Sequence, residues 1–470
     1  MVNDLSVLKT KTDSPIINFY KEKCIFLSGG TGFLGTVIIN KLLLTCKDLK
    51  NIYLLIKPKH NQSIKDRFDN LMNSKVFDKV RECNPNTLKK VIPISGNLLD
   101  DNLGLSQVDI QTLYNEVSIV FHSAANVNFN VPFIEAFDNN TRATEKMITF
   151  CKGIKQLQAF VYVSTAYSNC NKRFIDEKVY KTTNSLDSIK YFITQNGSNE
   201  FTGNLLDGRP NTYTYTKALT ENLIANEIGA IPAVIVRPSI ILGAESEPIP
   251  GWINGWKGLN NILGRQSIGQ LHCWKADRNA VVDVIPVDYV ANLTIAVAWD
   301  VHRRRNVHEK EVKVFNCCSG TRNPIQVGDL LEMNMKYSKK HVKQDVLIRP
   351  FFLIVKNYIV FWIIFFLVHT IPMYLNHIVD CVTKTKRGTS MIEMHRKLYN
   401  LVFALGFFAL NQFIFIDRNV KDLYSTMNKS DQKMFNFDVE NIKWDCYFEN
   451  AVLGLKKNLL DRTPVQKISS

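Results

Sequence analysis

The sequence predicts an α/β fold: a doubly wound parallel sheet wrapped by helices, followed by a mainly helical carboxy-terminal domain with a hydrophobic, membrane-associated segment. Two observations lead to this prediction. From Lys23 onward, short apolar runs alternate with helix-length amphipathic stretches, as in a parallel sheet with crossover helices. Later comes an apolar run, Tyr358 to Leu375, whose only strongly polar member is His369.

The expected strands follow one another along the first part of the chain. They lie in the runs CIFLSG, NIYLLIK, VIPISG, SIVFHSAA, AFVYVST and AVIVRPS, and FLGTVIINKLLL is the first helix. Between about 245 and 345, loops and a charged segment precede one more strand candidate, VKVFNCCS. We therefore expect a first, α/β domain over residues 14–345, the hydrophobic segment over 346–376 and a carboxy-terminal domain over 377–465.

Composition limits the compartment and the partners. The chain has 470 residues, of which 46% are hydrophobic, which is enough apolar material for two domains. Its net charge of +15 favours an anionic bilayer or a phosphate-rich small molecule, whereas nucleic acid is poorly supported because no basic and aromatic module stands out. The ten cysteines form no CxxC pair and no signal peptide precedes them, so we expect reduced thiols, no metal site and a cytosol-facing protein.

The run from Tyr358 to Leu375 is the candidate membrane segment. As a helix it would rise about 27 Å, the lower limit for crossing a hydrocarbon core. It can span the membrane or enter and return, and the alternative is a buried helix of the second domain. We expect membrane insertion, with Lys356 at its start reaching back toward water.

A glycine-rich turn directly follows the first expected strand and opens the first helix. Gly29, Gly32 and Gly35 have the spacing of a dinucleotide-binding turn of the Rossmann type. Such a turn lets a pyrophosphate approach the backbone and the helix amino end. The second strand ends at Lys57 and Lys59, where an NAD enzyme would carry an acidic residue. Lysines there attract a 2′-phosphate, so NADPH is expected rather than NADH.

A tyrosine and a lysine stand four residues apart in NTYTYTK, at the start of an expected helix. This spacing places Tyr213 and Lys217 on one face, whereas Tyr215 points elsewhere. Tyr213 is the expected general acid, its pKa lowered by Lys217, and Lys217 could also hold the nicotinamide ribose. A hydroxyl from AFVYVSTAYSN completes the set; we favour Thr165, with Ser164 as the alternative.

The ordered set GGTGFLG, FHSAANVNF, VYVSTAY, NTYTYTK and VRPSIILGAESEPIPGWING resembles the extended short-chain dehydrogenases, specifically the fatty acyl-CoA reductases. The tail segments MHRKLYNLVF, FIFIDRNVKDLYSTMN and MFNFDVENIKWDCYFENAVLGLKK resemble that family's carboxy-terminal domain, so the resemblance covers about Ser14 to Leu460. It implies reduction of a long-chain acyl-CoA by two NADPH, through an aldehyde, to a primary alcohol and CoA. The expected cofactor-binding residues are Gly29, Thr31, Gly32, Phe33, Leu34, Gly35, Lys57, Lys59, Asn97, Leu98, His122, Ala124, Ala125, Lys217, Pro238 and Ser239.

The chain departs from the family pattern at three places: Asn97 replaces the usual Asp, Lys57 an Arg, and Asn254 the Asp of GWIDN. None of these is a catalytic group. Arg303 to Arg305 is a further basic run that could meet CoA or lipid. The alternatives are a sterol-type or other NADP-dependent dehydrogenase of this fold, and a membrane-bound NADPH-binding protein without turnover. From the family we expect the endoplasmic reticulum, with peroxisome or lipid droplet as alternatives. The sequence makes no prediction about the oligomeric state.

Overall fold

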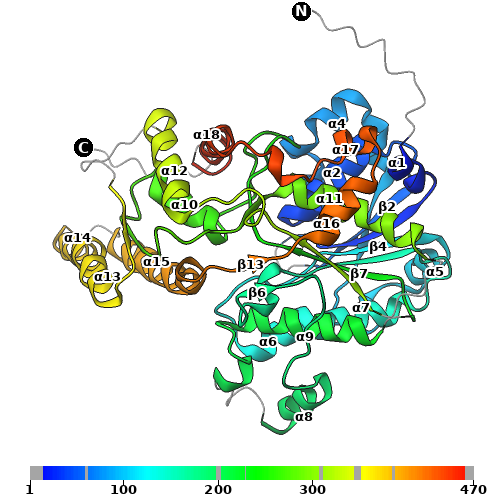
Figure 1. The fold of residues 1–470 in the computed structure, drawn as a ribbon, viewed down its shortest axis with the longest axis horizontal. Coiled ribbons are helices and arrows are strands. Elements are labelled where there is room, and N and C mark those ends of the chain that lie inside the picture. Colours follow the sequence, from blue (N-terminus) through cyan, green and yellow to red (C-terminus); the bar gives the residue numbers. More distant parts are fainter. Residues whose placement is uncertain are drawn as a thin grey trace, which may run out of the picture.

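A computed structural model describes residues 14–58, 62–196, 203–227, 229–305, 311–342, 351–383 and 387–460. Its centre is a parallel sheet of seven strands in the order β11-β7-β5-β4-β1-β2-β3 (Figure 1). The strands are β1 Cys24–Ser28, β2 Asn51–Ile56, β3 Val91–Ser95, β4 Val117–His122, β5 Ala159–Val163, β7 Ala233–Pro238 and β11 Lys313–Cys317. Most positions of β1, β4 and β5 are buried, as the continuous apolar runs of a covered parallel sheet require.

Strand order reverses between β1 and β4, which makes the sheet doubly wound. The chain runs outward from β1 to β3, crosses back to β4 and then builds the other half. Ser28 at the end of β1 lies opposite His122 at the end of β4. Open α/β sheets bind their ligands at such a reversal, outside the carboxyl ends of the strands.

Helices cover both faces of the sheet. In Figure 1, α2 and α11 lie above it and α7 and α9 lie below. The helices up to His341 are α1 Pro15–Tyr20, α2 Phe33–Thr45, α3 Ile64–Met72, α4 Asp78–Cys83, α5 Gln107–Glu116, α6 Phe133–Phe137, α7 Ala143–Cys151, α8 Leu186–Asn196, α9 Thr212–Asn226, α10 Gly258–Ser267, α11 Val287–Arg303 and α12 Val327–His341. The expected α/β class is confirmed.

The remainder of the chain is mainly helical. It contains α13 Tyr358–Phe365, α14 Ile371–Val382, α15 Arg387–Leu410, α16 Arg418–Thr426, α17 Lys429–Met434 and α18 Trp444–Leu455. Short parallel pairs attach it to the first part: β12 Leu353–Val355 to β9 Cys273–Lys275, and β13 Ile414–Phe415 to β6 Phe174–Ile175. A third pair, β8 Ile240–Leu242 with β10 Val284–Pro286, lies within the first part.

One hydrophobic core runs through both parts of the chain. The cluster that contains Ile25 and Val37 also contains Phe361, Val402 and Phe448. Buried side chains from both sides of the expected domain boundaries, near residues 345 and 377, pack together in this core. These boundaries therefore stay a prediction.

The expected apolar segment forms a nearly continuous helix. Residues Tyr358–Val379 make up the one helix among the described residues that is long and apolar enough to cross a membrane, with a mean hydropathy of 2.0. A π-helical turn, Phe366–Thr370, joins α13 to α14. The helix is mostly exposed, so the alternative of a helix buried in the second domain does not describe it.

Candidate active site

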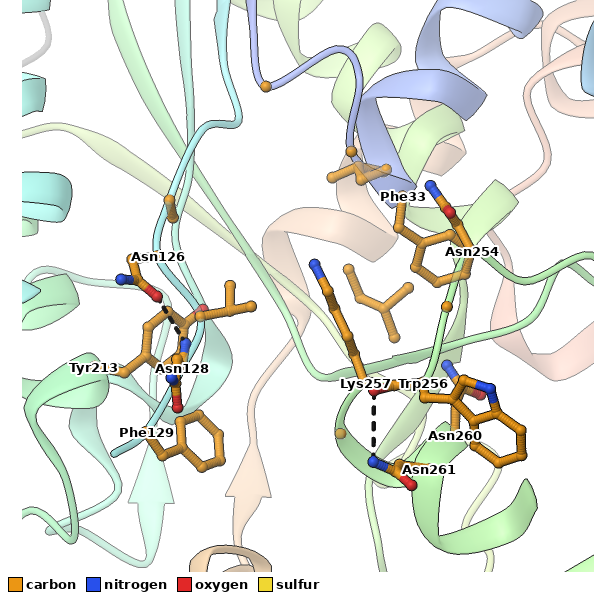
Figure 2. Close-up of a pocket in the computed structure, with 18 of the residues that line it drawn as sticks. Phe33, Asn126, Asn128, Phe129, Tyr213, Asn254, Trp256, Lys257, Asn260 and Asn261 are labelled. Carbon is orange, nitrogen blue, oxygen red and sulfur yellow. Dashed lines mark hydrogen bonds between the residues drawn. The ribbon is translucent and has the colours of Figure 1, made fainter. Parts of the chain in front are cut away.

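A cavity of about 2310 Å³ opens at the carboxyl edge of the sheet. Its walls come from the glycine turn after β1, the ends of β4, β5 and β7, the start of α9, the loop and helix around α10, and one side of α15. In Figure 2, Tyr213 and Phe129 lie on one wall, and Lys257, Trp256 and Asn260 lie across the cavity on the other. Both parts of the chain are thus needed to enclose it.

The glycine turn forms a close-fitting cradle beside the start of α2. Gly29 has a φ of +76°, and a Cβ there would lie 2.6 Å from the amide nitrogen of Ala124. Gly32 caps α2 without a side-chain hydrogen bond, so the first amides of that helix remain available to an anion. The residues fit a dinucleotide, and Thr31, Phe33, Leu34 and Gly35 line the same part of the cavity.

Arg67 is a cavity residue that the sequence reasoning missed. It lies on α3, and its Nη2 is 3.5 Å from Thr31 Oγ1 while its Nη1 donates to the carbonyl oxygen of Lys57. Its guanidinium therefore sits beside Lys57 at the end of β2. The sequence did contain a signal for this position: the capping box of Ser63 and Asp66 predicts that a helix begins soon after β2, and Arg67 lies in its first turn. Lys59 lies outside the described residues.

Other expected cofactor residues line the cavity, with one exception. Asn97, Leu98, Ala124, Ala125, Pro238 and Ser239 all border it. His122 is buried beneath it: its Nδ1 lies 2.7 Å from Ser28 Oγ and its Nε2 lies 2.9 Å from Thr144 Oγ1. Burial, with a smaller effect of Lys217, lowers the pKa of His122 to about 3. His122 thus connects β1 to α7 as a neutral ring, because burial disfavours its protonated form.

The two candidate hydroxyls at the end of β5 have different partners. Ser164 Oγ donates to Glu221 Oε1 at 2.5 Å. The side chain of Thr165 lies near the Tyr213 hydroxyl and opposes the rise in the pKa of that phenol. The geometry favours Thr165 over Ser164 as the partner of Tyr213, because Ser164 is committed to a buried carboxylate.

Lys217 lies on the same side of α9 as Tyr213, but its ammonium bonds elsewhere. Its Nζ donates to the carbonyl oxygen of Val163 at 2.7 Å and to the Tyr162 hydroxyl at 3.1 Å. Burial raises the pKa of Tyr213 to about 12 and lowers that of Lys217 to about 7, with Glu221 acting to raise the latter. The expectation that Lys217 lowers the pKa of Tyr213 is wrong for this geometry, because desolvation dominates at the phenol.

A buried ion pair fixes α9, the helix that carries Tyr213 and Lys217, against the sheet. Arg237 Nη2 lies 2.6 Å from Glu221 Oε2 and its Nε lies 2.8 Å from Oε1. Glu221 also accepts from Ser168 Oγ at 3.0 Å. Because Glu221 is one turn beyond Lys217 on α9, this network holds the helix against the ends of β5 and β7.

The wall next to Tyr213 is apolar. The Phe129 ring lies 5.6 Å from the Tyr213 ring and 5.7 Å from the Phe408 ring of α15. Leu401, Ala404 and Leu405 continue this wall along α15. The cavity next to Tyr213 therefore has a hydrophobic surface to which the carboxy-terminal part contributes.

Two further expectations concern groups outside this site. Arg303 and Arg304 both bind Asp300 at the end of α11, at 2.7 Å each, and neither lines the cavity, so these two do not meet a ligand there. Within the described residues no group of three or more His, Cys, Asp or Glu side chains could hold a metal ion.

Fold and site together are those of an oxidoreductase that uses a nicotinamide cofactor. A family model described as Male sterility protein, NAD-binding, matches residues 27–294, and a second, Sterile, also described as Male sterility protein, matches residues 368–462. Fatty acyl-CoA reductase 1 of Xenopus laevis is 34% identical over 452 residues, and fatty acyl-CoA reductase 2 of Mus musculus is 36% identical over 455. Each match covers 95% of this chain and 86% of the relative. The chain belongs to the fatty acyl-CoA reductase family.

Solved structures agree on the fold. The reductase domain of a nonribosomal peptide synthetase from Mycobacterium tuberculosis superposes with a TM-score of 0.59 at 16% identity, covering 93% of this chain and 92% of that one. The terminal R domain of the myxalamid pathway gives 0.58 at 16% identity, covering 94% and 92%.

Proposed function

We propose that this protein reduces long-chain fatty acyl-CoA to a primary fatty alcohol and CoA, using two NADPH and passing through an aldehyde. The observation that carries the proposal is the position of Tyr213: its hydroxyl lies near Thr165, and its ring borders the apolar wall of the cavity. Fatty acyl reduction is what the names of the relatives describe.

The chain's own residues account for binding and proton transfer. NADPH supplies the hydride when it is bound along the glycine turn. Thr165 and Tyr213 donate hydrogen bonds to the carbonyl oxygen as negative charge develops there, and Tyr213 then delivers the proton. Lys217 lies on the same side of α9 as Tyr213 and holds the nicotinamide ribose.

Both reductions use the same three residues. After the first, the hemithioacetal carbon loses the CoA thiol and becomes an aldehyde, whose carbonyl occupies the position that the thioester carbonyl had. A second hydride and a second proton then give the alcohol. An aldehyde held against the apolar wall between Phe129 and Phe408 would not need to leave the cavity between the steps.

The choice of NADPH rests on the charges at the end of β2. The guanidinium of Arg67 lies beside Lys57 and bonds Thr31 of the glycine turn, so two cations face the place where the adenosine ribose would lie. Lys57 alone cannot supply the forked geometry that suits a phosphate, whereas Arg67 can. Arg67 thus offsets the departure from the family's arginine at position 57.

The membrane is the proposed location, with the catalytic part facing the cytosol. Large apolar side chains gather on the exposed sides of α13, α14 and α15, among them Ile359 at 68%, Phe403 at 66% and Ile378 at 58% exposure. An exposed apolar face of this extent fits lipid better than water. The endoplasmic reticulum is the compartment that we propose, and the peroxisome and the lipid droplet are the alternatives.

The test is a lipid analysis of the reaction products. Membranes that carry the expressed protein are incubated with acyl-CoAs of increasing length and either NADPH or NADH, and the lipids are extracted and identified. Alcohol formed with NADPH is the expected result. Aldehyde alone would limit the protein to one reduction, and no reduced lipid from protein shown to bind NADPH would overturn the proposal in favour of another dehydrogenase or a protein without turnover.

A further inference from the structure

The cavity wall opposite Tyr213 carries positive charge that the proposed chemistry has not used. Lys257, Arg265 and Lys456 all line it. Among the described residues, no carboxylate forms an ion pair with any of the three, while Glu393, which also lines the cavity, is paired with Lys397 at 2.7 Å. In Figure 2 the side chain of Lys257 extends into the space between the two walls. This wall is therefore suited to an anion.

The amino end of α10 points to the same place. Lys257 is its N-cap, with extended backbone and no side-chain capping bond, and Gly258, Leu259 and Asn260 of the first turn line the cavity. The first amides of a helix have no partner inside the helix and carry the positive end of its dipole. An uncapped amino end directed at a cavity is an anion-binding arrangement.

Asn260 provides an independent observation. Its side chain is only 9% exposed and borders the cavity, and none of its polar atoms forms a hydrogen bond with another described residue. An amide that borders a cavity and has no protein partner can bond a ligand or water there. Asn261 differs, because it donates to the Trp256 carbonyl oxygen and accepts from Arg265 Nε at 2.8 Å.

Arg265 is held in position for this role. Its Nε bonds Asn261, its Nη1 donates to Gln270 Oε1 at 2.9 Å, and its guanidinium lies 5.9 Å from the Trp256 ring centroid. Burial lowers the pKa of Arg265, and no carboxylate of the described residues forms an ion pair with its guanidinium to oppose this. The cation is thus fixed one turn beyond Asn261.

We propose that the first turn of α10, with Lys257, Asn260 and Arg265, binds a phosphate group of the CoA part of the substrate. The inference rests on the proposed acyl-CoA reduction. A thioester carbonyl at Tyr213 has an acyl chain on one side and CoA on the other. The apolar side of α15 suits the chain, which leaves the cationic wall for CoA, while the uncapped start of α2 serves the pyrophosphate of the cofactor.

The test compares substrates with and without CoA in the full-length protein. Lys257→Gln is expected to raise the KM for palmitoyl-CoA about tenfold, the size of one lost bond to a charged phosphate. The KM values for hexadecanal and for NADPH should change less than about twofold, because neither uses the α10 wall. Lys155→Gln, the same change at an exposed residue outside the cavity, is the matched control.

Direct binding separates this inference from the proposed reaction. CoA is titrated into the protein loaded with NADP⁺, using wild type, Lys257→Gln and Asn260→Ala. Weaker CoA binding by both variants supports the subsite, even if the wild type reduces no acyl-CoA. Equal CoA binding by all three proteins, no CoA binding by the wild type, or a loss of NADPH affinity in place of CoA affinity overturns it.

Discussion

At the scale of single residues, the candidate site combines two polar groups, Tyr213 and Lys217, whose burial disfavours their charged forms. Burial makes the phenol of Tyr213 a weaker acid and makes the amine of Lys217 a weaker base, with pKa values of about 12 and about 7. Each shift disfavours the charged form, because neither group faces an opposite charge at contact distance. A cofactor ribose and a substrate oxygen would supply the missing partners, so the site is arranged to act only when it is filled.

Replacing Tyr213 by phenylalanine tests its role as the proton donor. We expect kcat to fall by about 100-fold to 10,000-fold, because the carbonyl oxygen loses both a hydrogen bond and its proton source. NADPH affinity, measured by fluorescence titration, should stay within about twofold, since the ring remains. Tyr215→Phe, two residues away and hydrogen-bonded to Asn184, should keep its rate. A Tyr213→Phe variant with normal turnover would exclude this role.

The pH dependence of cofactor capture should report Lys217. Its ammonium is charged below a pKa of about 7 and loses its proton as the pH rises through that value. Because the charged form is the one that holds the ribose, kcat/KM for NADPH is expected to be constant below about pH 7 and to fall above it. The profile is measured from pH 6 to 9 at saturating acyl-CoA. A constant kcat/KM across this range would show that the free protein keeps Lys217 charged.

Arg67 should determine the choice between the two nicotinamide cofactors. Arg67→Gln is expected to raise the KM for NADPH by about tenfold to 100-fold, because a forked contact with the 2′-phosphate is lost, and to leave the KM for NADH nearly unchanged. Steady-state kinetics with both cofactors measure the ratio. Arg173→Gln, an exposed arginine outside the cavity, is the control. Equal losses for NADPH and NADH would mean that Arg67 only supports the loop after β2.

At the scale of secondary-structure elements, the hairpin that the continuous helix α13–α14 forms with α15 is the least ordinary part of the fold. One side of the hairpin packs on β9 and β12, and its other side exposes large apolar residues. His369 shows which side faces the protein, because its Nε2 accepts from the His272 amide at 3.2 Å. The one strongly polar residue of the apolar run is thus turned inward, as the proposed membrane contact would require.

Charges placed on the exposed side should detach the protein from membranes. Ile363→Lys with Leu367→Lys changes two side chains that are 55% and 54% exposed. We expect the double variant to remain folded and to move from the membrane fraction to the soluble fraction in a liposome flotation assay, since each buried lysine costs about 2.5–3.5 kcal/mol at the centre of a membrane helix. Val108→Lys, an equally apolar and 76% exposed position on α5, should float like the wild type.

The sequence was informative wherever a short pattern determines local geometry. The order of the strands and helices, the glycine turn and the YxxxK face of α9 all follow from spacing along one element. The choice of Thr165 over Ser164 does not, because it depends on Glu221, which α9 brings from 57 residues away. The partners of His122 could not be predicted for the same reason: its bonds to Ser28 and Thr144 exist only once the strands are paired.

At the scale of the whole molecule, the active site belongs to both parts of the chain. Arg67, α10 and α15 meet at one cavity although they are far apart in sequence, so spacing could not place them together. Arg322 shows how the two parts are tied: it binds Asp417 at 2.7 Å and Asp438 at 2.5 Å across the join. The proposed catalytic groups come from α9 and from the end of β5, and the apolar wall that we propose for the acyl chain comes from α15.

This division predicts that acyl-chain preference can be changed from α15 without touching the catalytic groups. Ala404 lines the cavity between Leu401 and Phe408, so Ala404→Trp should fill the space that a long chain needs. We expect kcat/KM for an 18-carbon acyl-CoA to fall at least about tenfold relative to a 12-carbon one, because the added ring excludes the distal methylenes. Phe403→Trp makes a similar addition at the neighbouring residue, which is 66% exposed and outside the cavity, and should leave the ratio unchanged. If Ala404→Trp lowered both rates equally, the chain would have to lie along a different wall.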